Sequence, residues 1–336
     1  MIRVFQPNDK TFETNGDAVI IPIKARVKNQ DNGDFILDLT CDIKYNSVIK
    51  DNYIIVADTP QGAQAFRVRT ITKKANRLEV KAWHVFYDSE NYVIADSYAV
   101  NKTCDGALTH FNLALDSSTP FMVYSNISKV NNLRIVRNSF NEAIEKVIER
   151  WGGHLYRDNF SISVNEEIGE DKGVTIEYKK NLKELTAVYD WGEVVTKILP
   201  VGKDGTLIDS LYIEAAKQWD IPFTKVVEFQ QDIDEEDYPT QADYIAALKA
   251  DLYTQAFKYV NEYCYPRVNY TLKGNPEIVS DIGDTIHARD RRLGIDLVTK
   301  VTGYEYDAYT KQYISIEFGN FQNNLKTALN NYLKAL

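Results

Sequence analysis

Apolar and polar residues alternate along much of the first 98 residues, which is the pattern of half-buried β-strands. The alternation is most regular in residues 66–71 and 78–83, and residues 73–77 between them suit a hairpin turn. Residues 17–27 and 53–56 are rich in β-branched side chains and predict two further strands. Strands this short and frequent favour an antiparallel barrel or sandwich over a parallel sheet.

The hydrophobic period lengthens to that of a helix after Ser139. Ser139 and Glu142 have the spacing of a capping box, and Gly152-Gly153 supplies a stop. The apolar stripe of this helix consists of Phe140, Ile144, Val147, Ile148 and Trp151. A shorter helix is predicted further upstream, and we expect Asp105 to be its N-cap residue.

Strand patterns resume after the longer helix. Residues 155–157 and 160–164 flank Asp158-Asn159 and predict a hairpin. Later strands are predicted at the following positions: 174–178, 193–199, 268–272 and within 285–318.

One helix is predicted inside the C-terminal β-region. It begins near Thr240, with Asp243 three residues on, and ends at residues 263–266. Its expected apolar face consists of Ile245, Leu248, Leu252, Ala256 and Tyr259. After Gly319 a last helical stripe, suited to a partner or a trimeric stalk, consists of Leu325, Leu329, Tyr332, Leu333 and Leu336.

These patterns together predict an α+β chain that is mainly β and has several domains. We expect a β-barrel-like domain at residues 1–98 and an α+β domain at residues 99–190. A second β-barrel-like domain is expected at residues 191–322, with a helical insertion near residues 240–264. Residues 323–336 are predicted to form a C-terminal helix or linker.

The charge balance and the apolar runs exclude several classes of function. The 336 residues include 39 Lys and Arg against 48 Asp and Glu, a net charge of -9, and no basic block. Sequence-specific binding of nucleic acid is therefore not expected. The apolar runs are far shorter than the roughly 20 residues of a membrane helix, so we expect no membrane segment. The N-terminus has no apolar signal region, and the three cysteines fit reduced thiols.

The sequence contains no evident reaction centre. It has no Gly-x-Ser-x-Gly elbow for a serine nucleophile. Cys104 and His110 are the nearest thiol and imidazole in sequence, at the start of the predicted shorter helix, but a free cysteine is more often a small buried hydrophobe. We therefore predict no catalytic residue.

Metal and cofactor sites are not expected either. The histidines occur singly, without the spacing that places two on one helix face; they are His84, His110, His154 and His287. Residues 232–237 lack the glycine and glutamate of a calcium loop, and we predict a solvated loop before the helix. The glycines at residues 169–173 and 202–205 lack the helix and the Lys-Ser or Lys-Thr of a phosphate loop, so they are predicted to be turns. The sequence does not identify partner-binding residues.

Several segments taken in order resemble a known family. Residues 149–160 contain Gly152-Gly153 and Arg157-Asp158-Asn159, with His154 where the family usually has glutamate. Further matching segments are Gly169, Asp171, residues 173–178 and 180–182, residues 196–202, and residues 283–286, 298–301, 306–307 and 316–319. Over most of its length the chain resembles the prophage endopeptidase tail family, the tail-associated lysin or baseplate hub proteins of phage tails.

The resemblance implies a structural role. It implies a homotrimeric ring at the tail tip, in which two barrel-like domains per copy imitate the six-fold tail tube. The implied partners are the distal tail protein, the tape measure protein and a downstream fibre or lytic module. The implied location is the virion, assembled in the bacterial host cytoplasm. Longer relatives carry a hydrolase or fibre after the hub, and no residue here matches the hydrolase part, so we do not expect endopeptidase activity.

Other interpretations stay open beside this one. An acidic ring would repel DNA phosphates and let the genome pass during ejection, whereas the simpler interpretation is that net acidity keeps the chain soluble. A peptidoglycan hydrolase would require a carboxylate pair, or Cys104 and His110, to meet in a cleft. A carbohydrate- or receptor-binding module would use some of the 22 tyrosines to stack on sugars, although strand packing explains most of them.

Overall fold

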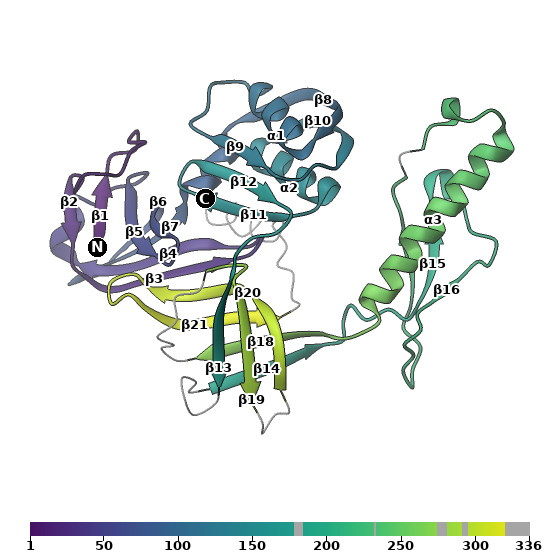
Figure 1. The fold of residues 1–336 in the computed structure, drawn as a ribbon. Coiled ribbons are helices and arrows are strands. Elements are labelled where there is room, and N and C mark those ends of the chain that lie inside the picture. The colour runs from purple at the N-terminus through teal and green to yellow at the C-terminus, as the bar shows by residue number, and fades with distance from the viewer. Residues whose placement is uncertain (178–183, 232, 274–280, 291–294, 320–336) are drawn as a thin grey trace. The chain divides into compact units, whose positions relative to one another are not determined.

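The computed structural model describes residues 1–177, 184–231, 233–273, 281–290 and 295–319. The chain divides into two compact units: unit 1 comprises residues 1–186 and 270–336, and unit 2 comprises residues 187–269. Unit 2 is thus inserted into the sequence of unit 1. The described residues form several sheets and three α-helices, so the predicted α+β, mainly β fold class is confirmed (Figure 1).

Thirteen strands form the largest sheet. Their order is β14-β18-β21-β20-β3-β4-β7-β6-β5-β1-β2, with β19 attached to β20 and β13 to β19. The strands are β1 (Ile2–Phe5), β2 (Ala18–Ile20), β3 (Pro22–Gln30), β4 (Phe35–Asp42), β5 (Ile54–Thr59), β6 (Gly62–Lys73), β7 (Arg77–His84), β13 (Asp171–Glu177), β14 (Glu184–Asp190), β18 (Arg267–Lys273), β19 (Thr285–Asp290), β20 (Ile295–Asp307) and β21 (Gln312–Gly319). Two 3-10 helices, η1 (Ile43–Ser47) and η2 (Val85–Asn91), interrupt the strands. The hairpin predicted around residues 73–77 is confirmed by β6 and β7.

The two β-rich ends of the chain meet at strand β20. Residues 303–307 of this strand pair with β3, whereas residues 295–300 pair with β19. Because β20 gives backbone hydrogen bonds to strands from both ends of the sequence, the two regions predicted to be barrel-like are continuous in one sheet. Among the described residues the strand path is open, and no pairing closes it into a barrel.

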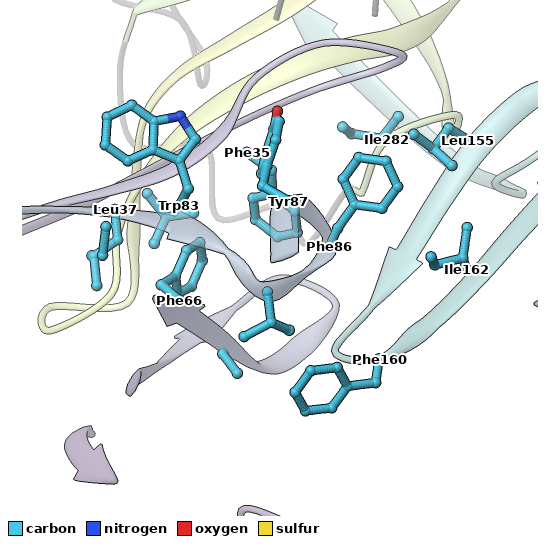
Figure 2. Close-up of a cluster of buried hydrophobic side chains, with 14 of the residues drawn as sticks. Phe35, Leu37, Phe66, Trp83, Phe86, Tyr87, Leu155, Phe160, Ile162 and Ile282 are labelled. Atoms are coloured by element: carbon cyan, nitrogen blue, oxygen red, sulfur yellow. The ribbon is translucent and has the colours of Figure 1, made fainter. Parts of the chain in front are cut away.

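The core of unit 1 lies on one face of the N-terminal part of this sheet. Along β4 the side chains of Phe35, Leu37 and Leu39 are buried, while those between them are partly exposed. Figure 2 shows Leu155, Phe160 and Ile162, which come from a different part of the chain, in the same cluster. Burying one such large side chain stabilises the fold by about 1.5–3 kcal/mol.

Those residues belong to a layer of two helices and two small sheets. Strands β8 (Val93–Thr103) and β10 (Val130–Ser139) pair antiparallel, and β12 (Ser161–Asn165) pairs with β11 (His154–Asp158) and, in parallel, with β9 (Met122–Ser125). The helices are α1 (Cys104–Leu113) and α2 (Phe140–Trp151) (Figure 1). The hairpin predicted around Asp158-Asn159 is confirmed, and Asn159 takes the left-handed conformation that its turn requires, with φ 50°.

Helix α2 forms as its sequence predicts. The backbone N–H of Ser139 donates to Glu142 Oε2 at 2.9 Å, which is one half of the capping box. Gly152 ends the helix with φ 81°. The buried stripe contains Phe140, Ile144, Val147 and Trp151 as predicted, while Ile148 is half-buried.

The predicted N-cap of α1 is wrong. Thr103 is the cap, and its Oγ1 accepts a hydrogen bond from the backbone N–H of Gly106 at 3.2 Å. Asp105 lies inside the first turn, where its carboxylate accepts from the backbone N–H of Ser125 at 3.0 Å. Both residue types suit a cap, and the extended backbone at the end of β8 selects the threonine.

Unit 2 consists of helix α3 (Gln241–Tyr263) on a three-stranded sheet, β16 (Ile213–Glu214), β15 (Lys197–Val201) and β17 (Thr224–Glu228). The short 3-10 helices η3 (Lys203–Gly205) and η4 (Glu235–Asp237) also belong to it. The strand predicted at residues 193–199 begins only at Lys197. The preceding backbone is held differently, because the N–H of Val195 donates to the carbonyl of Tyr263 at the end of α3.

Helix α3 starts as predicted but faces the sheet with a different stripe. Thr240 Oγ1 accepts from the N–H of Asp243 at 3.1 Å, which confirms the predicted start. The predicted face is wrong at Ile245, which is 41% exposed, and Tyr259 is only half-buried. The buried stripe is Tyr244, Leu248, Leu252, Ala256 and Val260. Apolar residues on more than one side of α3 left the sequence pattern ambiguous, and the position of the sheet resolves it.

The predicted domain ranges cut across the two units. The helical insertion near residues 240–264 is α3 in unit 2, whereas the strands of residues 285–319 lie in unit 1. The division into folding domains at residues 98, 190 and 322 stays a prediction.

The helical stripe from Leu325 to Leu336 falls outside the described residues. None of the helices in the described ranges is long and apolar enough to cross a membrane.

Candidate functional surfaces

Arg157 anchors the Arg-Asp-Asn segment in the interior of unit 1. Its side chain is 3% exposed, and its guanidinium donates to the carbonyl of Gly33 at 2.7 Å and to that of Gln30 at 2.9 Å. A third bond goes to Asn29 Oδ1 at 3.0 Å, and the guanidinium lies 5.2 Å from the ring centre of Phe35. A buried cation is costly unless its donors are satisfied, and here neutral acceptors and a ring face satisfy them.

The next two residues of the segment bind strand β6. Gln64 Nε2 donates to Asp158 Oδ1 at 2.9 Å, and the backbone N–H of Asn159 donates to Gln64 Oε1 at 3.0 Å. Asn159 Oδ1 also accepts from the backbone N–H of Ala65 at 2.9 Å. The Arg-Asp-Asn segment, which is part of the family resemblance, therefore attaches the β11–β12 hairpin to the large sheet through hydrogen bonds.

His84 completes this network as a neutral side chain. Its Nδ1 accepts from the backbone N–H of Phe86 at 3.2 Å, so Nε2 carries the proton and donates to Gln64 Oε1 at 3.0 Å. Burial, and then the nearby Arg157 cation, hold the pKa of His84 well below its usual value. This histidine is a structural residue of the core.

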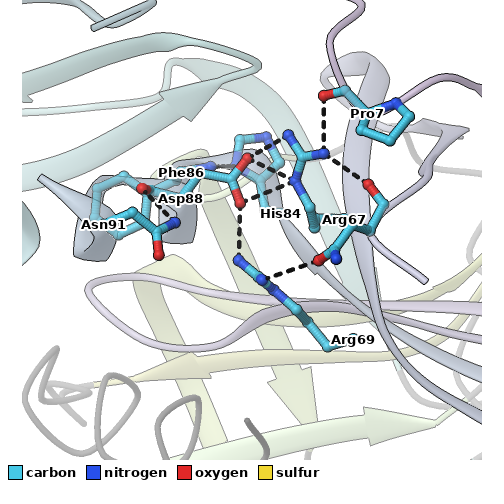
Figure 3. A network of polar contacts seen from close by, with 8 residues as sticks. Pro7, Arg67, Arg69, His84, Phe86, Asp88 and Asn91 are labelled. Carbon is cyan, nitrogen blue, oxygen red and sulfur yellow. Dashed lines mark hydrogen bonds and ion pairs between the residues drawn. The ribbon is translucent and has the colours of Figure 1, made fainter.

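A second polar network fixes η2 to strand β6 of the large sheet (Figure 3). Arg67 contacts both oxygens of Asp88, with Nη2 2.6 Å from Oδ2, and Arg69 Nη2 donates to Oδ1 at 3.0 Å. Arg67 Nη1 also reaches the carbonyl of Pro7 at 2.9 Å. One carboxylate thus holds two guanidinium groups and, through Arg67, the N-terminal segment, which is a rigidifying arrangement rather than a reaction centre.

The other three histidines lie apart. His110 Nε2 is 2.9 Å from Ser97 Oγ, and His154 Nδ1 donates to Asp31 Oδ2 at 2.7 Å. His287 lies 3.8 Å from a carboxylate oxygen of Asp171. In the part of the chain that the structure describes, no group of three or more His, Cys, Asp and Glu residues is placed to hold a metal ion.

Cys104 is not prepared for nucleophilic attack. It is fully buried at the first position of α1, and burial raises the pKa of its thiol. A nucleophilic cysteine requires the opposite shift. His110 is engaged with Ser97, so the pair weighed from the sequence does not form a thiolate–imidazole dyad.

A carboxylate pair does meet in a cleft, at Asp281 and Asp284. Burial raises the pKa of Asp281 to about 6. Asp284 is 2% exposed, and both of its oxygens are occupied: Oδ1 accepts from the N–H of Glu170 at 2.9 Å, and Oδ2 accepts from Lys172 Nζ at 2.6 Å. The N–H of Asp281 also donates to Oδ2, at 2.8 Å. The buried carboxylate of Asp284 therefore holds residues 170–172 next to residues 281–284. No local sequence pattern predicts that these two segments lie side by side.

Two glycines allow those segments to approach. Gly169 and Gly283 have φ of 77° and 85°, and a Cβ on Gly169 would lie 2.0 Å from the carbonyl carbon of Gly283. Only glycine fits at such an approach. The Gly-x-Asp-x-Gly and Gly-Asp-Thr segments of the family resemblance thus join strands β13 and β19, which pair in parallel.

The acidic segment before α3 is an exposed turn. Asp234, Glu235 and Glu236 are exposed, and Asp232 lies outside the described residues. The chain here lines an open hollow that extends to Gln241. The glycines at residues 202–205 form the turn at η3, as predicted.

Tyrosines serve mainly as packing residues. Tyr304, Tyr306 and Tyr313 are buried together, with ring centres 5.2–6.5 Å apart. In the part of the chain that the structure describes, the exposed tyrosines are spread over both units and are Tyr98, Tyr124, Tyr189, Tyr212, Tyr253, Tyr265 and Tyr309. Because these tyrosines do not gather in one place, they do not mark a surface where sugars would stack.

Comparisons with known proteins identify a family model and solved structures that this chain resembles. Residues 170–329 match the family model described as "Prophage endopeptidase tail". No curated protein matches the chain. The structure is similar to that of prophage tail protein gp18 from Listeria monocytogenes EGD-e, with 17% identity, 99% of this chain and 98% of that chain covered, and a TM-score of 0.67.

Two further solved structures agree. The tail protein from Neisseria meningitidis MC58 is 10% identical, with 95% and 96% of the chains covered and a TM-score of 0.64. The 43 kDa tail protein of prophage MuSo2 from Shewanella oneidensis is 13% identical, with 89% and 93% covered and a TM-score of 0.60. The resemblance predicted from the sequence is confirmed: the chain has the fold of prophage tail proteins and matches the prophage endopeptidase tail family over residues 170–329.

Proposed function

We propose that this chain is a structural protein of a phage or prophage tail tip, a homotrimeric baseplate hub that closes or extends the tail tube. The observation that carries the proposal is the full-length likeness to prophage tail protein gp18, which covers 99% of this chain and 98% of that one. The match of residues 170–329 to the prophage endopeptidase tail model supports it independently.

The proposal includes the partners and the location that follow from such a role. The hub would dock on the distal tail protein, meet the tape measure protein and carry a downstream fibre or lytic module in the virion after assembly in the host cytoplasm. A ring of three copies, each with a net charge of -9, would let DNA pass without adhering during ejection, because like charges repel.

We also propose that the chain itself does not hydrolyse the cell wall. Cys104 has a raised thiol pKa, and both oxygens of Asp284 are engaged by neighbouring donors. A wall-clearing assay with the purified chain should show no activity. Clearing that is lost in Asp281→Asn would contradict this part of the proposal and support the hydrolase alternative.

Native mass spectrometry of the chain, alone and mixed with the distal tail protein of the same phage region, tests the hub itself. The proposal predicts a species of three chains, alone or on mixing. A monomer in both samples would contradict the proposed trimer.

A further inference from the structure

Helix α3 carries a second apolar face, on a different side from the one that packs on its own sheet. Tyr253 and Phe257 are each 50% exposed, and their rings stack with centres 6.1 Å apart and planes 10° apart. Ala250 and Ala246 are exposed one and two turns earlier. The spacing of four, three and four residues places the two alanines and the two rings in one stripe along the helix.

The sheet of unit 2 has an uncovered face as well. Ile198 points to the α3 side and is fully buried, so its neighbour Leu199 points to the other side. The register of β15 and β17 places Val226, 66% exposed, beside Leu199 on that outer side. The ammonium of Lys197 lies 4.7 Å from the ring centre of Tyr212, which adds this ring to the same face.

The two faces belong to different layers of unit 2, one to helix α3 and the other to the sheet of β15 and β16 (Figure 1). A single self-complementary patch would produce a closed dimer, but two different patches allow the helix face of one copy to pack on the sheet face of the next. Such a head-to-tail contact repeats around a ring. A partner of another kind would require only one of the two faces.

The charges at the two faces are complementary. Lys258 follows Phe257 and is exposed at the border of the helix face, and Glu228 is exposed two residues after Val226 on the strand. In the described part of the chain neither side chain has an ion-pair partner. An ammonium on one face and a carboxylate on the other would pair between neighbouring copies and set their register.

We propose that the α3 face of Ala250, Tyr253 and Phe257 in one copy packs against the outer sheet face of Leu199, Tyr212 and Val226 in a second copy of this chain. Lys258 of the first copy then meets Glu228 of the second. The inference rests on the proposed ring of like copies and names a surface that would hold it together.

Crosslinking between two different full-length variants tests this surface. Phe257→Cys and Val226→Cys are prepared separately, and the native Cys41, Cys104 and Cys264 are buried. With a short bismaleimide we expect a covalent dimer in the mixture and none in either variant alone, because the contact joins unlike faces. Ser117→Cys, at an exposed position in unit 1, mixed with Val226→Cys gives the background.

Other crosslinking results would overturn the inference. A dimer in Phe257→Cys alone would mean a symmetric helix-to-helix contact. If a monomeric variant did not react with a maleimide at its introduced thiol, the same chain would cover that face. A trimer in native mass spectrometry without a crosslink in the mixture would reject this surface and leave the hub standing. The absence of both trimer and crosslink would reject both.

Charge reversal provides a second, independent readout. Lys258→Glu or Glu228→Lys alone should lower the crosslink yield about threefold to tenfold. The chain that carries both reversals should restore it, because each copy then presents the opposite charge. Equal yields in all four chains would contradict the proposed register.

Discussion

Units 1 and 2 differ in how completely they cover their own apolar surface. Unit 1 joins strands from both ends of the chain and buries Arg157, His84 and Asp284 with satisfied hydrogen bonds. Unit 2 has a core cluster of nine buried residues among those described and leaves apolar side chains exposed on its helix and its sheet. Small units bury a smaller fraction of their surface, so they depend more on association. Among the residues that the structure describes, unit 1 also exposes large apolar side chains, such as Ile23 and Leu113, but unit 2 exposes more of them in proportion to its length. We therefore expect unit 2 to depend more on assembly than unit 1.

The largest effect is expected where unit 1 buries its cation. Arg157→Met would remove three hydrogen bonds that a buried guanidinium donates and would leave Asn29 Oδ1 without a donor. The carbonyl of Gln30 would keep the N–H of Gly33, and that of Gly33 would keep the hydroxyl of Tyr87. At about 1.5–3 kcal/mol for each hydrogen bond to a charged group, we expect a loss of at least about 3 kcal/mol in the free energy of urea unfolding.

Arg134→Met is the matched control for Arg157→Met. Arg134 pairs with Asp96 at an exposed site, with an Nη2–Oδ2 distance of 2.6 Å, and its removal should shift the urea midpoint far less than Arg157→Met does. Equal losses of stability in the two variants would mean that the buried hydrogen bonds of Arg157 do not stabilise unit 1 more than a surface ion pair does.

Variants that create a cavity in one of the two cores test whether the two units unfold independently. Leu39→Ala in unit 1 and Leu252→Ala in unit 2 each remove a buried leucine and should cost about 2–5 kcal/mol. Hydrogen exchange followed by mass spectrometry should show the loss of protection confined to the unit that carries the cavity. Loss of protection in both units from either variant would show that they unfold as one, against the comparison.

The N-terminus of α3 gives a smaller local effect in unit 2. Thr240→Ala removes the acceptor of the Asp243 N–H and should destabilise the helix by about 1 kcal/mol. Thr254→Ala is the control, since Thr254 Oγ1 donates to the carbonyl of Ala250 inside the helix, at an exposed position. Faster amide exchange at the start of α3 in Thr240→Ala alone is the expected result, and equal exchange in both variants would contradict the cap.

The smallest effect concerns pH and the His154–Asp31 pair of unit 1. The hydrogen bond to Asp31 raises the pKa of His154 above its usual 6.5. Its stabilisation is therefore fully present below pH 6.5 and is lost as the pH rises through the raised value. The urea midpoint of the wild type should fall relative to that of His154→Gln over this range. The difference between the two chains removes the contribution of Asp281, and a difference that stays constant from about pH 5 to about pH 9 would contradict the pair.

Sequence reasoning succeeded where the determinants are local. The capping box of Ser139 and Glu142 and the stop at Gly152 lie within one segment, so α2 was predicted almost residue by residue. The Thr103 cap and the buried face of α3 were missed because each depends on which of two suitable neighbours the tertiary structure selects.

Long-range pairings left no such signal. Asn29 and Tyr304 are linked by a 3.3 Å hydrogen bond across most of the sequence, and the approach of Gly169 to Gly283 depends on strands far apart in the chain. The sequence identifies the Arg-Asp-Asn segment as a family feature. Its structural role, which is to attach the β11–β12 hairpin to the large sheet, follows only from its hydrogen-bond partners on β3 and β6. Specificity of this kind comes from tertiary contacts, which residue patterns do not encode.

Cryo-electron microscopy of the chain mixed with the distal tail protein would show the proposed hub itself. We predict a three-fold ring of this chain around an open channel, docked on the partner ring. Particles that hold a single copy of this chain, or copies without an open channel, would contradict the proposal that it is the hub of a tail tip.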